Sequence, residues 1–150
     1  MSEFKRILLA EDNAADLELT LEALGQSRLA NEVDVVRDGA DALDYLFRRG
    51  AYASRPEGNP AVVLLDLKMP KVDGLQVLRQ VKADERLRTV PIVMLTSSRE
   101  EQDLVESYRL GVNAYVVKPV DFGRFIEAVK QLGMFWAVVN EPPPGSVRRG

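Results

Sequence analysis

Two chemically versatile residue types are missing from this chain of 150 residues, which contains neither cysteine nor histidine. Without cysteine, the chain forms no disulfides, and thiol chemistry and cysteine-ligated metals are excluded. Without histidine, it lacks the commonest general base and metal ligand, so any bound metal must be a hard cation held by oxygen atoms. The absence of cysteine fits a reducing cytosol, and we expect a cytoplasmic protein.

Strong positive charge and long apolar runs are missing as well. The formal net charge is −3, with 29% charged residues, so the chain has no basic field of the kind that duplex DNA requires, and we expect no nucleic acid partner. The start, Met1 to Arg6, leads into a short apolar stretch and then acids, which is neither a signal peptide nor a membrane span. A length of 150 residues predicts one domain with its own core.

Five short apolar segments alternate with stretches of helical periodicity. The central segment, Val62 to Asp66, lies between Pro60 and Pro70 and is typical of a strand buried on both faces. The other four are Ile7–Ala10, Val33–Val36, Pro91–Thr96 and Ala114–Val117. This alternation predicts the α/β class: a single doubly wound domain with a five-stranded parallel sheet and helices on both faces, flavodoxin-like in type.

Capping and turn residues mark the expected helix ends. Asn13 and Asp38 are predicted N-caps, and Gly25 and Gly50 are predicted to end the first two helices. Residues 50 to 60 have no period and many structure breakers, which predicts a surface loop. A basic cluster accompanies this loop and consists of Arg48, Arg49 and Arg55.

The last helix, predicted from Asp121, places apolar residues on every side near its end. These residues are Phe135, Trp136, Val138 and Val139. Such an end is usually covered, either by a partner or by the rest of its own domain, and we expect a homodimer through these residues. The predicted domain spans residues 1–140 with an extended last helix, and a short proline-rich tail occupies 141–150.

Carboxylates follow two of the predicted strands. Glu11 and Asp12 come directly after the first strand, and Asp66 ends the third. Taken alone, each acid could serve as a helix cap or a solvated charge. Strands one and three are neighbours in such a sheet, however, and three carboxylates at one edge would repel unless a cation compensates them. Mg²⁺ is the natural cation for such an all-oxygen site.

Two further polar residues end strands at the same predicted edge. Thr96 ends the fourth strand and Lys118 follows the fifth, and only the second strand contributes no such residue. An acidic nucleophile, a carboxylate-bound Mg²⁺, a hydroxyl donor and a lysine are the groups needed to hold a phosphoryl group on Asp66. Phosphoryl transfer depends mostly on positioning and charge neutralisation, so the missing histidine is no objection.

Four segments of the chain resemble the motifs of the receiver domain of two-component response regulators, the CheY-like family. The resemblance runs from about Arg6 to Leu132. The segments are Leu9-Ala10-Glu11-Asp12-Asn13, Leu64-Leu65-Asp66-Leu67-Lys68-Met69-Pro70-Lys71-Val72-Asp73-Gly74, Met94-Leu95-Thr96-Ser97-Ser98 and Tyr115-Val116-Val117-Lys118-Pro119. All four occur in the order that the family has.

The resemblance implies a role for each acidic residue. Asp66 would accept a phosphoryl group from a phosphohistidine on a histidine kinase or phosphotransfer protein. Asp12 and Asp66 would hold Mg²⁺ together with the backbone carbonyl of Lys68, and Glu11 would act through water. The chain would then be a phosphoacceptor signalling domain that promotes its own phosphorylation and dephosphorylation, and not an enzyme with a separate substrate.

The resemblance also implies roles for the strand-end residues. Lys118 would pair with the aspartate or its phosphoryl group, and Thr96 would donate its hydroxyl to a phosphoryl oxygen. Tyr115 is similar to the switch aromatic that turns inward when Thr96 moves, although it would pack on its strand in any case. Lys118 and Pro119 are similar to the cis peptide of the family. Lys68, Ser97 and Ser98 occupy positions that vary in the family and tune the lifetime of the phosphoaspartate.

The long loop and the chain ending look like those of stand-alone regulators that pair with phytochrome-linked histidine kinases. In that subgroup the last helix and tail form a homodimer. We expect no attached output domain, so the signal would pass by protein contact, through the face of strand four, helix four and strand five, or by onward transfer of the phosphoryl group.

Three other classes remain as alternatives. A degenerate receiver would act only as a docking module, but the intact set of Asp12, Asp66, Thr96 and Lys118 argues against it. An aspartyl-phosphate phosphatase resembles a pattern with a second aspartate two residues after the nucleophile, where this chain has Lys68. A flavodoxin-like cofactor binder would need a phosphate loop after the first strand, where Glu11 and Asp12 would repel a phosphate.

Overall fold

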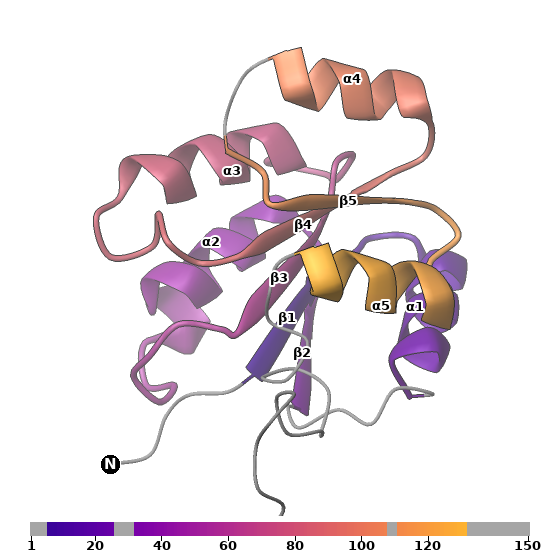
Figure 1. The fold of residues 1–150 in the computed structure, drawn as a ribbon. Coiled ribbons are helices and arrows are strands. Elements are labelled where there is room, and N and C mark those ends of the chain that lie inside the picture. The colour runs from indigo at the N-terminus through magenta and orange to yellow at the C-terminus, as the bar shows by residue number, and fades with distance from the viewer. Residues whose placement is uncertain (1–5, 26–31, 108–110, 132–150) are drawn as a thin grey trace, which may run out of the picture.

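The computed structural model describes residues 6–25, 32–107 and 111–131, and Figure 1 shows their arrangement. Five strands alternate with five helices, and one 3₁₀ helix follows the second helix. The strands are β1 (Arg6–Ala10), β2 (Glu32–Val36), β3 (Val62–Asp66), β4 (Ile92–Thr96) and β5 (Ala114–Val117). The helices are α1 (Ala14–Gly25), α2 (Gly39–Phe47), η1 (Gly50–Tyr52), α3 (Gly74–Ala83), α4 (Arg99–Ser107) and α5 (Phe122–Gln131).

The five strands form one parallel sheet in the order β2-β1-β3-β4-β5. This confirms the predicted fold class and the predicted neighbours β1 and β3. In the register of these two strands, Ala10 lies opposite Leu65. Because parallel strands all end at the same edge, the residues that follow Ala10 and Leu65 meet there.

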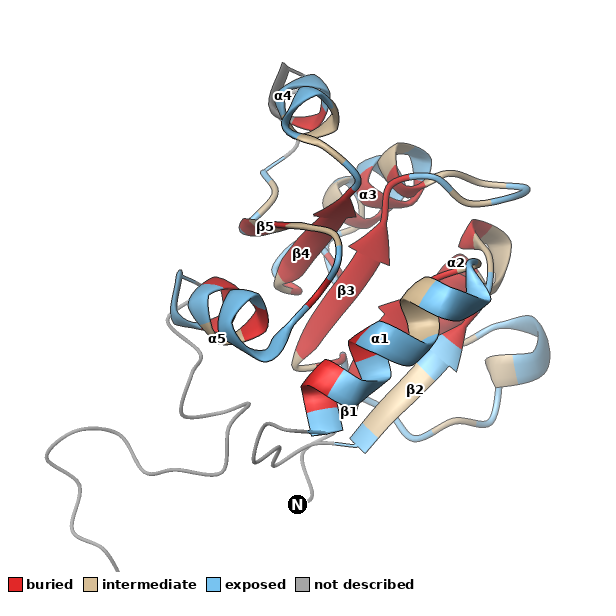
Figure 2. Ribbon diagram, turned by 90° about the vertical axis from the view of Figure 1, so that its right-hand side faces the viewer, coloured by how far each residue is buried: buried red, intermediate tan, exposed pale blue. Residues whose placement is uncertain are grey.

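Two apolar cores lie on opposite faces of the sheet. Side chains alternate along each strand, so Leu8 and Val63 face one core while Ile7 and Val62 face the other. Helices α2, α3 and α4 cover the first face, and α1 and α5 cover the second. All five residues of β3 are buried, as Figure 2 shows in red. Because its neighbours bury β3 on both faces and both edges, Asp66 has a rigid support.

Two helix predictions need correction. The helical spacing of Leu17, Leu21 and Leu24 predicts that the three leucines share the buried face of α1. Leu21 is exposed instead, and the buried residues of α1 are Thr20, Ala23 and Leu24. Helix α2 ends before the predicted stop at Gly50. Arg48 forms its C-cap in the left-handed conformation (φ 54°), and its N–H donates to the carbonyls of Asp44 and Tyr45. A non-glycine residue therefore takes the position that the sequence assigned to glycine.

The loop after α2 is held in place by the side chain of Arg55. Its Nε donates to the carbonyl of Tyr45 (2.7 Å), and its Nη1 donates to the carbonyls of Pro56 and Gly58 (2.8 and 2.9 Å). The guanidinium also lies over the Tyr45 ring, 4.6 Å from the ring centroid. Arg55 is thus a structural anchor for the loop, and not one charge of an exposed basic cluster.

The predicted cap of α5 is present, because the N–H of Arg124 donates to Oδ1 of Asp121 (2.8 Å). Phe125 and Val129 are buried on the face that the periodicity indicated. The expected dimer residues Phe135, Trp136, Val138 and Val139, and the tail from 141, lie outside the described residues. Among the helices of the described ranges, none has the length and apolarity needed to cross a membrane.

We expect Gly74→Ala to destabilise the protein. A Cβ atom at Gly74 would lie 2.3 Å from the carbonyl oxygen of Asp66 and 2.9 Å from Cα of Leu67. Both are backbone atoms, so neither can rotate away, and the substitution should lower the free energy of unfolding by about 1–3 kcal/mol in urea denaturation. Gly25→Ala is the matched control. A Cβ atom at Gly25 would have no such neighbour within 4 Å, so a comparable loss there would contradict the steric explanation.

Candidate functional site

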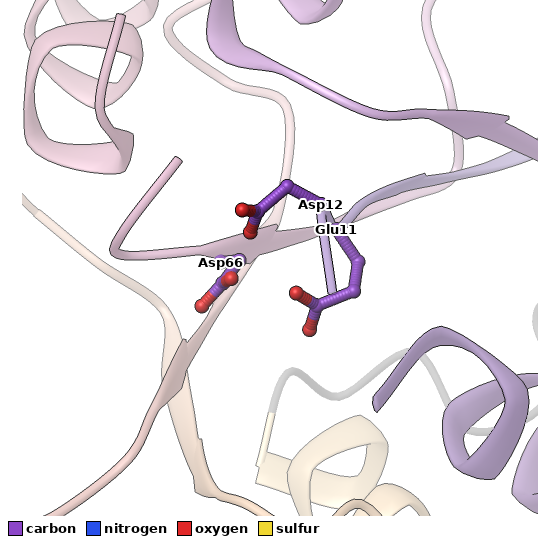
Figure 3. Close-up of side chains that lie close together, drawn as sticks. All are labelled: Glu11, Asp12 and Asp66. Atoms are coloured by element: carbon purple, nitrogen blue, oxygen red, sulfur yellow. The ribbon is translucent and has the colours of Figure 1, made fainter. Parts of the chain in front are cut away.

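Three carboxylates gather where β1 and β3 leave the sheet. Glu11 directly follows β1, Asp12 comes next, and Asp66 is the last residue of β3. Oxygen atoms from the three side chains lie within 4.8 Å of one another, and Figure 3 shows the side chains converging on a common space. Glu11 and Asp66 are buried, whereas Asp12 is partly exposed. The strand register therefore brings together the acids that the sequence singled out.

Lys118 brings its ammonium group into this acidic cluster. Its Nζ lies 2.7 Å from Oε1 of Glu11, 3.1 Å from Oδ1 of Asp66 and 3.1 Å from Oδ2 of Asp16. The contact with Glu11 is an ion pair without hydrogen-bond geometry. The peptide bond between Lys118 and Pro119 is cis, the form that the resemblance implied. Lys118 thus compensates charge that would otherwise be buried alone.

Burial and the neighbouring charges shift the pKa values of Asp66 and Lys118. Burial, together with the neighbouring Glu11, raises the pKa of Asp66 to about 8, although Lys118 works in the opposite direction. Burial by itself would lower the pKa of Lys118, but Glu11 and Asp66 outweigh that effect and raise it above its ordinary value. The ammonium group therefore stays charged, and the site still carries more negative than positive charge.

Thr96 and Tyr115 occupy neighbouring strands beside the acids. Thr96 ends β4, is fully buried, and its hydroxyl oxygen has no hydrogen-bond partner among the described residues. Buried hydroxyls are normally paired, so the Thr96 hydroxyl is a candidate donor to a bound group. Tyr115, on β5, is partly buried and packs against the core under α2, α3 and α4.

Lys68 lies outside the cluster, on the loop that follows β3. Its side chain is 78% exposed, and its Nζ lies 3.6 Å from Oε2 of Glu101 on α4. The Glu101 carboxylate also accepts from the hydroxyl and the N–H of Ser97. The spacing of Ser98 and Glu101 predicts a capping box, but only half of it forms. The Ser98 hydroxyl accepts from the N–H of Glu101, while the Glu101 side chain accepts from Ser97 and not from the N–H of Ser98.

Sequence reasoning missed Arg37, which follows β2. Its Nε donates to the carbonyl of Glu11 (3.0 Å), and its Nη2 donates to the carbonyl of Asp12 (2.9 Å). The expectation that β2 contributes nothing to this edge was therefore wrong. Arg37 is exposed and two carbonyls are its partners, so no charge pattern in the sequence could have revealed it. It fixes the backbone that carries two of the acids.

The cluster has the donor set of a divalent cation site. Three carboxylates from two strand ends suit a hard cation that keeps several waters. The buried carboxylates already attract the ammonium group of Lys118, and their excess negative charge would favour a second cation. Residues 7–130 match the response regulator receiver domain family.

The chain belongs to this family. The solved structure of the bacteriophytochrome response regulator RtBRR is similar, with 65% identity and a TM-score of 0.87, and the match covers 97% of this chain and 87% of that one. The response regulator Rcp1 of Synechocystis sp. is 39% identical over 132 residues, 88% of each chain. The Mn²⁺-bound structure of Rcp1 has 35% identity and a TM-score of 0.72, covering 97% of this chain and 99% of that one.

The solved structure of the phosphorylated cyanobacterial phytochrome response regulator RcpA is also similar. It has 41% identity and a TM-score of 0.71, and the match covers 90% of this chain and 94% of that one. The protein is therefore a two-component response regulator receiver.

Divalent cation binding at this cluster, titrated with Mg²⁺, should tighten as the pH rises from about 6.5 to about 8.5. The pKa of Asp66 is raised to about 8, so below that pH a proton occupies the carboxyl group and the cation must displace it. One displaced proton corresponds to about a tenfold rise in apparent affinity per pH unit below the pKa, and none well above it. Isothermal titration calorimetry measures the affinity at each pH.

Asp12→Asn is the control for this pH dependence. The substitution removes a carboxylate from the cluster but leaves the protonated Asp66 in place, so the affinity should fall at every pH while its slope with pH persists. An affinity in the wild type that does not change between these pH values would contradict the proton competition.

Proposed function

We propose that this receiver accepts a phosphoryl group on Asp66 from a phosphohistidine of a histidine kinase or phosphotransfer protein. The main support for this proposal is the position of Asp66 at the end of a fully buried strand. Lys118 Nζ lies 3.1 Å from its carboxylate, and the carboxylates of Glu11 and Asp12 are close enough to share a cation with it. The relative RcpA, whose structure is of a phosphorylated form, supports it. In this step the P–N bond to the histidine breaks and a P–O bond to an Asp66 oxygen forms.

The neighbouring groups would stabilise the charge of the transferred phosphoryl group. Lys118 would move from a carboxylate to a phosphoryl oxygen, which keeps its charge compensated. The unpaired hydroxyl of Thr96 would donate to another phosphoryl oxygen. Since Thr96 is fully buried, a shift of its side chain would leave space that the neighbouring Tyr115 could enter.

A divalent cation, which we propose to be Mg²⁺, would be held by Asp12, Asp66 and the backbone carbonyl of Lys68, with Glu11 acting through water. The Mn²⁺-bound structure of Rcp1 supports this assignment. The bound cation would neutralise part of the negative charge that Asp66 and the phosphoryl group share. Arg37 would keep the backbone of Glu11 and Asp12 in position through its two hydrogen bonds.

Phosphorylation would be read out at the face formed by β4, α4 and β5. An open groove of about 490 Å³ lies there between α4 and α5, and Tyr115 is part of its lining, with Arg99 and Gln102 on the α4 side. A change in the position of Tyr115 would alter this groove and therefore the protein contacts it makes. The names of RtBRR and RcpA support a phytochrome-linked kinase as the partner.

Two alternatives fit the site less well. A docking module without phosphorylation would not need the buried lysine among acids or the unpaired hydroxyl of Thr96. A phosphatase would need an acid two residues after Asp66, and Lys68 there is an exposed base whose ammonium pairs with Glu101.

Incubation of the wild type with Mg²⁺ and acetyl phosphate should add one phosphoryl group, detected by intact-protein mass spectrometry. Asp66→Asn should show no gain, because the substitution is nearly isosteric and removes only the nucleophilic carboxylate. Asp103→Asn is the control for loss of one exposed carboxylate on α4, and it should be phosphorylated like the wild type.

A gain of mass in Asp66→Asn equal to that of the wild type would refute Asp66 as the acceptor. If neither protein gains mass, the same comparison with a phosphorylated histidine kinase tests the natural donor. Failure with both donors would favour the docking module.

We also propose a homodimer through Phe135, Trp136, Val138 and Val139, within a domain that extends to residue 140. Ending the chain before Phe135 should shift it from twice the monomer mass to the monomer mass in sedimentation equilibrium. Ending it before Glu141 removes only the proline-rich tail and should leave the dimer intact. Equal masses for the two shortened chains would contradict this assignment.

A further inference from the structure

Lys118 makes a third contact that the proposed phosphorylation does not require. Its Nζ donates to Oδ2 of Asp16 over 3.1 Å with hydrogen-bond geometry. An ammonium group has three N–H donors, and Lys118 has three carboxylates around it, from Glu11, Asp66 and Asp16. Three carboxylates therefore already share the charge of Lys118 before a phosphoryl group arrives, and one of these contacts must be given up.

The local structure of α1 explains why the Asp16 carboxylate is available to the lysine. Asn13 caps α1, and its Oδ1 accepts from the N–H of Asp16 (2.9 Å). In a complete capping box, the acid at this third helical position would in turn accept from the N–H of the cap residue. Here Oε2 of Glu11 accepts from the N–H of Asn13 (3.2 Å), so the Asp16 side chain is left for Lys118.

Of the three carboxylates, Asp16 is the one that can release the lysine most readily. Glu11 is fully buried, and Asp66 is the acceptor itself. The Asp16 side chain is 34% exposed and lies in the first turn of α1. Water and the helix N-terminus would both stabilise its charge once the lysine has left.

We propose that Asp16 is a positioning residue that holds Lys118 in the unphosphorylated receiver and so slows phosphorylation of Asp66. This inference rests on the proposed function. Asp16 acts in two ways: it occupies an N–H donor that the phosphoryl group needs, and it adds negative charge to a site that must receive an anion. Asp16 itself makes no contact with the phosphoryl group in this scheme.

Asp16→Asn should raise the initial rate of phosphorylation by acetyl phosphate about three- to tenfold, because it removes a negative charge close to the entering anion. Asp16→Glu, which restores a carboxylate, should return the rate toward that of the wild type. Glu18→Gln is the matched control on the same helix. It makes the same change in net charge at an exposed side chain and should leave the rate unchanged.

The ammonium ¹⁵N signal of Lys118, recorded by NMR without metal or phosphodonor, tests whether Asp16 acts through the lysine. Its assignment follows from its absence in Lys118→Met. We expect Asp16→Asn to move this signal, and Glu18→Gln to leave it in place. A merely structural role of Asp16 in α1 would not combine a shifted lysine signal with faster phosphorylation.

The outcomes separate this inference from the proposed function. If the wild type is phosphorylated and Asp16→Asn matches Glu18→Gln in rate, the inference is wrong and the function stands. A faster rate with an unmoved lysine signal would also overturn it, since Asp16 would then not hold Lys118 in the unphosphorylated receiver. If no variant is phosphorylated by acetyl phosphate or by a kinase, the proposed function fails and the inference fails with it.

Discussion

The attraction between the Lys118 ammonium and the surrounding carboxylates is the interaction on which the functional edge of the sheet depends. Three carboxylate oxygens lie 2.7 to 3.1 Å from its Nζ. Without that charge, nothing would compensate the buried carboxylates of Glu11 and Asp66, and the pKa of Asp66 would rise further. The lysine keeps the acids close together while the site remains receptive to another cation.

The parallel sheet makes this arrangement possible. Hydrogen bonding between strands sets the register in which Ala10 lies opposite Leu65 and Thr96 opposite Val117, so the residues after them converge from distant parts of the chain. Helices on both faces bury β3 completely. The acceptor is therefore held by a rigid core, while its neighbours Lys68 and Arg37 lie in exposed connections.

Contacts between the connections link the site to the rest of the molecule. Arg37 joins the end of β2 to the carbonyls of Glu11 and Asp12, and Glu101 joins α4 to Lys68 and Ser97. A change of charge at Asp66 would therefore act on groups that belong to several elements. Such coupling would let a change at Asp66 alter the surface of the receiver itself.

The sequence by itself determined the fold class, the five strands and the neighbouring strand-end acids, because short apolar segments alternate with stretches of helical periodicity. It also determined the family, because four motifs occur in the order that the family has. It was misleading where tertiary contacts overrode local preference, as at Leu21 and at the end of α2. Only the tertiary structure decided that Arg37 and Asp16 belong to the site. Their roles depend on which carbonyl or ammonium group lies within hydrogen-bonding distance, and residues far apart in sequence reach that distance only in the folded chain.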